Sequence, residues 1–286
     1  NYYTLLALDN KLALIRKYID LQRQAEKIAE IQKEADSDTE LAVEKFKAEL
    51  AKARSQEFAL KQEITECENA LNLLLGRYPT PIQRDAKQLL NEDVKTIVTG
   101  LPSNLLSHRP DIRQAEHELA AAHWDVETAR KAFLPSVNIS ATLGLEAFNP
   151  TYLTRMPKSL AYSVVGGLTA PLINRKAIEA NFQQADAAQL QALYEYDKIL
   201  LTAYSEVCTL LSKNKNLAAY YALKEEEVKT LEHSVEVSRQ LYMNGRATYL
   251  DVLGAERDAL DAQMELLETR QQQLSCVVDL YRSLGE

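Results

Sequence analysis

The sequence predicts a mainly α-helical protein made of long antiparallel helical hairpins, with one β-hairpin inserted between two helices. The chain has 286 residues but only eight glycines and eight prolines, which leaves room for long uninterrupted helices. Apolar residues recur at helical spacing along most of the chain, whereas those from Val137 to Leu145 alternate with a period of two. Shifting the sequence by 209 positions aligns one hairpin with another, which indicates an internal repeat.

The first predicted helical hairpin occupies residues 1–78. Its apolar residues fall at helical spacing and are interrupted only at residues 36–39, a polar cluster of helix-capping residue types. Gly76, followed by Pro79, is typical of the end of a helix. Residues 79–103 are then expected to form a linker, or equatorial, segment.

A β-hairpin is predicted after the next helix. Residues 104–134 return to helical spacing, and Pro135 closes that helix. Residues 135–172 are predicted to hold a pair of strands, with apolar and polar residues alternating in the first strand and Pro171 ending the second.

The second long helical hairpin is predicted for residues 173–286. No glycine or proline interrupts the chain from Arg175 to Tyr242, which favours one very long helix. Gly245 marks the turn, and residues 248–285 form the last predicted helix.

The repeat aligns the end of the first hairpin with the end of the second without a gap. Matched positions include Leu41 with Leu250, Val43 with Val252, Ala53 with Ala262, Cys67 with Cys276, and Gly76 with Gly285. By the same offset, the first copy of the strand-containing unit is expected to begin roughly 110 residues upstream of Asn1. An isolated hairpin is marginal in water, and only a closed barrel satisfies strand backbones in lipid. Several chains are therefore expected to pool their strands in a transmembrane β-barrel.

Composition excludes several classes of protein. A net charge of −8 and a pI of about 5.3 argue against a nucleic-acid partner. No apolar run approaches the roughly 18 residues of a spanning helix, so a membrane crossing would use strands. The three cysteines are far apart and are expected to be small buried apolar residues. The chain opens inside a predicted helix, so the natural N-terminus is expected to lie upstream.

Several motifs, in order along the chain, carry a resemblance to a known family. They are Asn1-Tyr2-Tyr3-Thr4-Leu5, Arg109-Pro110-Asp111-Ile112, Phe133-Leu134-Pro135-Ser136, Pro171-Leu172-Ile173, Tyr242-Met243-Asn244-Gly245 and Leu280-Tyr281-Arg282-Ser283-Leu284-Gly285. Together they resemble the TolC-like outer-membrane efflux proteins, and more closely the OprM-like, or NodT-type, lipoprotein branch.

The resemblance implies a homotrimer in the outer membrane of a Gram-negative bacterium. Its protomers would share one β-barrel in outer-membrane lipid, continued across the periplasm by a tunnel of coiled-coil helices. The implied partners are a periplasmic adaptor protein and an inner-membrane pump of the RND type. The implied function is the passive export of drugs, metals or other small solutes, without a cofactor.

The resemblance also suggests gate residues at the periplasmic entrance. Tyr242 and Asp251 match the family's gate positions, but Gly254 and Ala42 stand where the family carries acidic residues. The first hairpin's acidic cluster is the alternative source of a charged ring, since such a ring sets selectivity; its candidates are Asp36, Asp38 and Glu40. These residues would otherwise be solvated helix caps.

No catalytic constellation, cofactor motif or metal site is found in the sequence, so an enzyme is not expected. The four histidines include no pair at i, i+4 spacing. Arg109, Pro110 and Asp111 are interpreted as the start of a helix, with the acidic side chain in the first turn. Two other functions remain open: a helical coiled-coil scaffold, for which no strands are expected, and an adaptor protein of the cell envelope.

Overall fold

A computed structural model of the chain describes residues 1–34, 40–92, 109–146, 160–170 and 174–285. The described elements are the helices α1 (Tyr2–Glu34), α2 (Glu40–Leu74), α3 (Gln88–Asn91), α5 (Pro110–Lys131), α6 (Arg175–Met243) and α7 (Tyr249–Leu284), and the strands β1 (Ser136–Leu145) and β2 (Leu160–Thr169). Mainly helical architecture with long antiparallel pairs and one β-hairpin is thus confirmed. None of the described helices combines the length and the apolar character that crossing a membrane requires.

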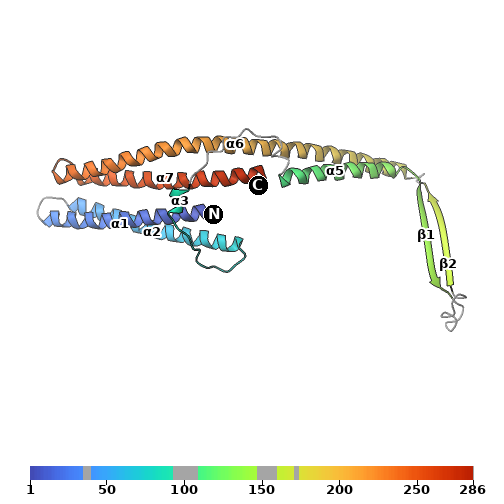
Figure 1. Cartoon of the computed structure of the whole chain (residues 1–286), viewed down its shortest axis with the longest axis horizontal. Coiled ribbons are helices and arrows are strands. Elements are labelled where there is room, and N and C mark those ends of the chain that lie inside the picture. The colour runs from blue at the N-terminus through green and yellow to red at the C-terminus, as the bar shows by residue number, and fades with distance from the viewer. Residues whose placement is uncertain (35–39, 93–108, 147–159, 171–173, 286) are drawn as a thin grey trace. The chain divides into compact units, whose positions relative to one another are not determined.

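The chain forms two compact units. One, the helical unit, comprises Asn1–Leu101 and Glu206–Leu284; the other, the hairpin unit, comprises Pro102–Ser205. In the helical unit α1 and α2 run side by side, and α7 lies along α1 (Figure 1). In the hairpin unit β1 pairs with β2 in one antiparallel sheet, which follows α5.

The core of the helical unit lies where α1, α2 and α7 meet. One cluster joins Ile15, Tyr18 and Ile19 of α1 to Leu50 and Ala53 of α2 and Leu260 of α7. These residues fall at three- and four-residue spacing, which places them on one face of each helix.

Two of the long helices end in the same way. The N–H of Gly76 donates to the carbonyl of Leu73, and the N–H of the following residue donates to the carbonyl of Asn72. Gly245 ends α6 with the equivalent pair of bonds, and both glycines have positive φ, +66° and +69°. This Schellman geometry favours glycine because a Cβ is strained there.

The repeat is visible as a repeated contact. The thiol of Cys67 donates to the backbone carbonyl of Asn1 at 3.4 Å, and the thiol of Cys276 donates to that of Leu210 at 3.6 Å. The two donors, Cys67 and Cys276, are 209 positions apart, and so are the two acceptors, Asn1 and Leu210. Burial raises the pKa of both thiols. Cys276 is buried and Cys67 is partly buried, whereas Cys208 is exposed, so the expectation that all three cysteines are buried is wrong for Cys208.

Part of the predicted linker, or equatorial, segment (residues 79–103) lies across the helical unit, and we call it the strap. Leu89 of α3 is fully buried among Leu6, Ala7, Leu267 and Leu274. Arg84 bonds to both Asp9 of α1 and Glu68 of α2. Arg270 of α7 donates to the carbonyl of Leu89 at 3.2 Å. A helix of four residues is too short to show a hydrophobic period, so sequence periodicity misses it.

Two glycine substitutions test the turn at the end of α6. Gly245→Ala is expected to lower the free energy of unfolding by about 1 kcal/mol, because alanine is strained at positive φ. The matched control is Gly254→Ala in the interior of α7, where a Cβ meets nothing within 4 Å. That change is expected to raise stability by about 0.5–1 kcal/mol. Denaturation followed by helical circular dichroism checks both, and equal shifts of the same sign would contradict the assignment.

Candidate functional site

The β-hairpin is amphipathic, with one wholly apolar or small-residue face. Residues that pair across the two strands share a face of the sheet. One face is formed by Val137, Ile139, Ala141, Leu143 and Leu145 with their partners Leu168, Gly166, Val164, Tyr162 and Leu160. These side chains are exposed, for example 75% for Ile139 and 80% for Tyr162.

The opposite face carries small and polar side chains. It is formed by Ser136, Asn138, Ser140, Thr142 and Gly144 with their partners Thr169, Gly167, Val165, Ser163 and Ala161. None of the twenty strand residues is charged. Within the described part of the chain, each strand pairs only with the other, so both outer edges present unpaired backbone groups.

Such a hairpin needs an apolar surrounding and further strands. Transferring one exposed Val, Leu or Ile side chain from water to an apolar medium is worth about 1.5–3 kcal/mol. Open strand edges promote pairing with other strands. The hairpin therefore has the chemistry of a segment that lies in lipid as part of a larger sheet.

Asp251, one of the predicted gate residues, lies in the first turn of α7. Its carboxylate accepts bonds from the backbone N–H of Thr248 at 2.8 Å and from the hydroxyl of the same residue at 2.7 Å. These bonds lower the pKa of Asp251. In this arrangement the side chain stabilises the start of α7, as acidic residues in a first turn do.

Tyr242, the other predicted gate residue on the second hairpin, lies against the first hairpin. It packs on a cluster that contains Phe46 of α2 and Tyr249 and Leu253 of α7. The rings of Phe46 and Tyr249 are 5.7 Å apart. The aromatic residues at this end therefore connect the two helical hairpins.

One turn further into α7, a buried carboxylate joins three helices. Glu256 is 8% exposed. It accepts bonds from the guanidinium of Arg239 on α6 at 2.6 and 3.0 Å, and from the amide of Gln22 on α1 at 2.8 Å. The side-chain amide oxygen (Oε1) of Gln22 is buried without a hydrogen-bond partner among the described residues. Buried charges of this kind fix register when they are fully paired.

The same two positions carry an ion pair of opposite sense in the first hairpin. Glu30 and Lys47, which are the counterparts of Arg239 and Glu256 under the 209-residue offset, lie 3.7 Å apart. Both of their side chains are about half exposed. Both copies of the repeat thus carry an ion pair at these two positions, but the acidic and the basic residue are exchanged.

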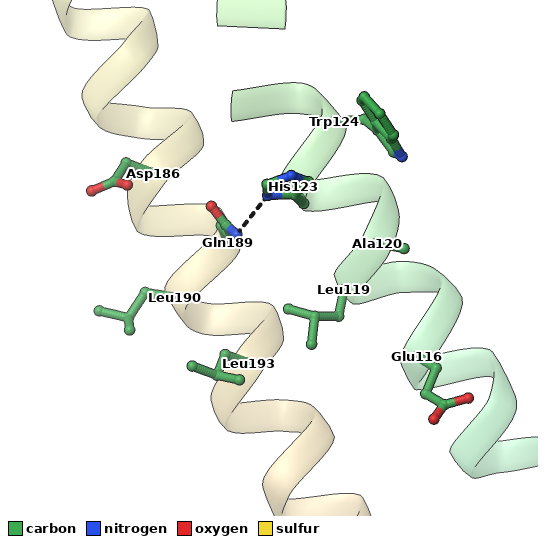
Figure 2. A pocket seen from close by; sticks show the side chains of 9 residues that line it. All are labelled: Glu116, Leu119, Ala120, His123, Trp124, Asp186, Gln189, Leu190 and Leu193. Carbon is green, nitrogen blue, oxygen red and sulfur yellow. Dashed lines mark hydrogen bonds between the residues drawn. The ribbon is translucent and has the colours of Figure 1, made fainter. Parts of the chain in front are cut away.

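The hairpin unit has a groove of about 560 Å³ between α5 and α6. Figure 2 shows His123 of α5 facing Gln189 of α6, joined by a hydrogen bond of 3.3 Å. Leu119, Leu190 and Leu193 line the groove, with Glu116 and Asp186 also at its walls. The leucine side chains that line this groove are suited to packing contacts with other apolar side chains. Nowhere in the described ranges do three His, Cys, Asp or Glu side chains gather as metal ligands.

The remaining predicted residues that the structure describes lie at the ends of helices and strands. Glu40 lies in the first turn of α2, whereas Asp36, Asp38 and Pro171 lie outside the described residues. Pro110 and Asp111 start α5, and Arg109 pairs with Asp111 at 2.7 Å, which lowers the pKa of that carboxyl. Pro135 directly precedes β1.

Sequence reasoning missed Glu256 and its partners. A signal was present, because one stripe of α7 alternates leucine with a polar residue along a seven-residue repeat. The stripe runs Leu253, Glu256, Leu260, Gln263, Leu267, Arg270, Leu274. Polar residues in such a seam are candidates for specific pairing.

Removing the buried carboxylate tests its structural weight. Glu256→Ala is expected to lower the free energy of unfolding by about 3 kcal/mol, because it leaves Arg239 and Gln22 without their acceptor. Lys47→Ala removes the exposed counterpart pair and is expected to cost less than about 1 kcal/mol. Chemical denaturation of the purified protein measures both. Equal losses of the free energy of unfolding would show that Glu256 contributes no more than a surface ion pair does.

The capping role of Asp251 predicts a pH dependence. Because folding lowers its pKa, its contribution is complete above the unfolded-state pKa and is lost as the pH falls through the lower folded-state value. The melting temperature of Asp251→Asn should therefore lie below that of the unsubstituted protein at neutral pH. This difference should shrink below pH 3.8, the ordinary pKa of the group. A difference that does not change with pH would exclude the charged cap.

Curated relatives of the chain are outer-membrane components of efflux systems. The solvent efflux pump outer membrane protein SrpC of Pseudomonas putida is 30% identical over 252 residues, which cover 88% of this chain and 53% of SrpC. The pyoverdine export outer membrane protein OpmQ of Pseudomonas aeruginosa is 30% identical over 285 residues, which cover 100% of this chain and 60% of OpmQ. The chain thus spans about half the length of the curated relatives it matches.

The fold and the sequence profile agree with these relatives. The crystal structure of CusC superposes with a TM-score of 0.90 at 26% identity, covering 99% of this chain and 66% of CusC. A family described as outer membrane efflux protein matches residues 101–286. These findings confirm the resemblance drawn from the motifs. The chain belongs to the outer membrane efflux protein family.

Proposed function

We propose that this chain is part of the channel subunit of a tripartite efflux system, a homotrimeric duct for passive export through the outer membrane. The observation that carries the proposal is the uncharged β-hairpin, with its exposed apolar face and open edges. Family membership supplies the context of efflux. The alternative of a helical scaffold expected no strands, so the hairpin counts against it.

In this proposal the two faces of the hairpin have different surroundings. The apolar face contacts outer-membrane lipid, and the face with Asn138, Ser140 and Thr142 lines a water-filled interior, as in transmembrane barrels. The open edges of β1 and β2 pair with further strands of the assembled protein, which removes the unpaired backbone groups.

The helices form the periplasmic part of the duct. We assign residues 1–78 and 173–286 to its helical hairpins, residues 79–103 to the equatorial segment, and residues 104–134 to the helix that leads into the strand pair 135–172. A periplasmic adaptor protein and an inner-membrane pump of the RND type dock at the hairpin end.

The proposed gate lies at the turns of the hairpins. Tyr242 ties the second hairpin to the first through the aromatic cluster, and Asp251 is an exposed carboxylate at the start of α7. With Asp36, Asp38 and Glu40 of the first hairpin, Asp251 would form an acidic ring that attracts cations and repels anions.

The solute is proposed only as a broad class. The names of the relatives refer to solvents, pyoverdine and cations, the last in the cation efflux system protein CusC of Escherichia coli. An uncharged polar face in the hairpin fits this range, because it offers no fixed charge by which to select a solute. We therefore propose small solutes, selected by the pump rather than by the strands.

Alternate thiol labelling tests the proposed surroundings of the hairpin. In the full-length protein with its native cysteines replaced, Asn138→Cys and Ser140→Cys are expected to react with a charged, water-soluble maleimide in intact outer membranes. Ile139→Cys and Leu143→Cys, on the other face, are expected to stay unlabelled, because lipid excludes the reagent. Labelled bands on a gel give the readout.

Solubilisation in denaturing detergent is the control and should make all four positions reactive. Equal labelling of the two faces before solubilisation would show that the apolar face does not lie in lipid. The channel proposal would then lose the observation that carries it.

A further inference from the structure

The uncharged hairpin is joined to its helices through two short segments of positive charge. Residues 130–135 span the end of α5 and lead into β1, and residues 170–178 follow β2 and lead into α6. Together these segments contain four basic and no acidic residues, whereas the whole chain has a net charge of −8. Positive charge is therefore concentrated where the strands meet the helices.

Both segments lie at the same end of the strand pair. Lys131 stands five residues before the first residue of β1, and Arg175 stands six residues after the last residue of β2. These two strand ends pair with each other in the sheet. The rings of Phe133 and Phe182 are 6.3 Å apart, which holds the end of α5 beside the start of α6 (Figure 1). The basic residues of the two segments thus share one end of the hairpin.

Three of the four basic side chains form no ion pair within the described part of the chain. Arg130 pairs with Glu127 at 3.3 Å, whereas Lys131, Arg175 and Lys176 are exposed and have no carboxylate partner there. Helix stability does not account for two of them. Arg175 and Lys176 stand in the first turn of α6, which holds no acidic residue, and the helix macrodipole disfavours cations at that end. Their charge is available to a partner outside the chain.

The neighbouring side chains favour phospholipid headgroups as this partner. Phe133 and Leu134 lie between Lys131 and β1 and are 36% and 63% exposed, so apolar surface continues from the hairpin to the cations. A membrane presents the matching order, with acyl chains followed by a polar headgroup layer about 5–8 Å thick on each side. Lys and Arg place their aliphatic stems on apolar surface and extend their charged ends into such a layer. There they bind phosphate oxygens through charge-assisted hydrogen bonds.

We propose that Lys131, Arg175 and Lys176 form a binding site for the phosphate groups of anionic phospholipids in the periplasmic leaflet of the outer membrane. This inference rests on the proposed position of the hairpin in lipid and adds a specific lipid site at its helix end. Each Lys or Arg held near an anionic lipid surface strengthens the attraction. The site would fix the depth at which the strand pair leaves the membrane.

Lipid titration of the full-length protein tests the site. Phosphatidylglycerol is added to the detergent-solubilised protein, and native mass spectrometry counts the lipids that stay bound. The triple variant Lys131→Gln, Arg175→Gln and Lys176→Gln is expected to bind this lipid at least about tenfold more weakly than the unsubstituted protein, because three cations are lost from the site.

A second triple variant is the matched control. Lys198→Gln, Lys213→Gln and Lys215→Gln remove the same charge from α6, about 33 Å or more beyond the start of the helix. This control is expected to bind phosphatidylglycerol as the unsubstituted protein does.

Thermal unfolding distinguishes lipid binding from a structural role. Glutamine is a good helix former and cations are unfavourable at the start of α6, so the Lys131, Arg175 and Lys176 variant is expected to keep or raise the melting temperature. A lower melting temperature with unchanged lipid binding would assign these side chains to the stability of the fold and overturn the lipid site.

The remaining outcomes separate this inference from the function on which it rests. Equal lipid binding by the two triple variants overturns the site, and the channel proposal stands if thiol labelling still places the apolar face of the hairpin in lipid. Loss of the bound lipid in millimolar inorganic phosphate would indicate a site for free anions and overturn lipid as the ligand. If thiol labelling does not distinguish the two faces of the hairpin, both proposals fall.

Discussion

The seam between α1 and α7 is the interaction on which the helical unit depends. Its leucines remove apolar surface from water, and its polar residues each find a partner on another segment: Glu256 on α1 and α6, Gln263 on α6, and Arg270 on the strap. Leucine contacts alone would tolerate a slip of the two helices past each other. The polar partners do not, because a slip would leave a buried charge or amide unpaired.

Much of the chain's apolar surface is not used within the chain. The hairpin exposes one whole apolar face, and α2 and α6 expose large apolar side chains such as Phe58 and Leu223. A soluble monomer seldom leaves such surface in water. The uncharged strand pair suits lipid and further strands.

The sequence predicted the elements whose signal extends over many residues. Alternation from Val137 to Leu145 predicted β1, and the absence of Gly and Pro predicted α6 almost to its ends. The sequence also indicated that Asp251 caps a helix, because Thr248 stands three residues before it. Leu89 and Arg84 were not predictable, because their positions depend on contacts with helices far away in the sequence. Glu256 was hidden for the same reason, as its partners come from two other helices.

The uncharged hairpin also constrains how the protein is made. Twenty strand residues without a charge, with both edges open, lack the lysines and prolines with which soluble proteins protect their edge strands. During the interval between synthesis and assembly, this segment would pair with any other extended chain that it met. We therefore expect its biogenesis to require an escort that shields the hairpin until lipid and neighbouring strands replace it.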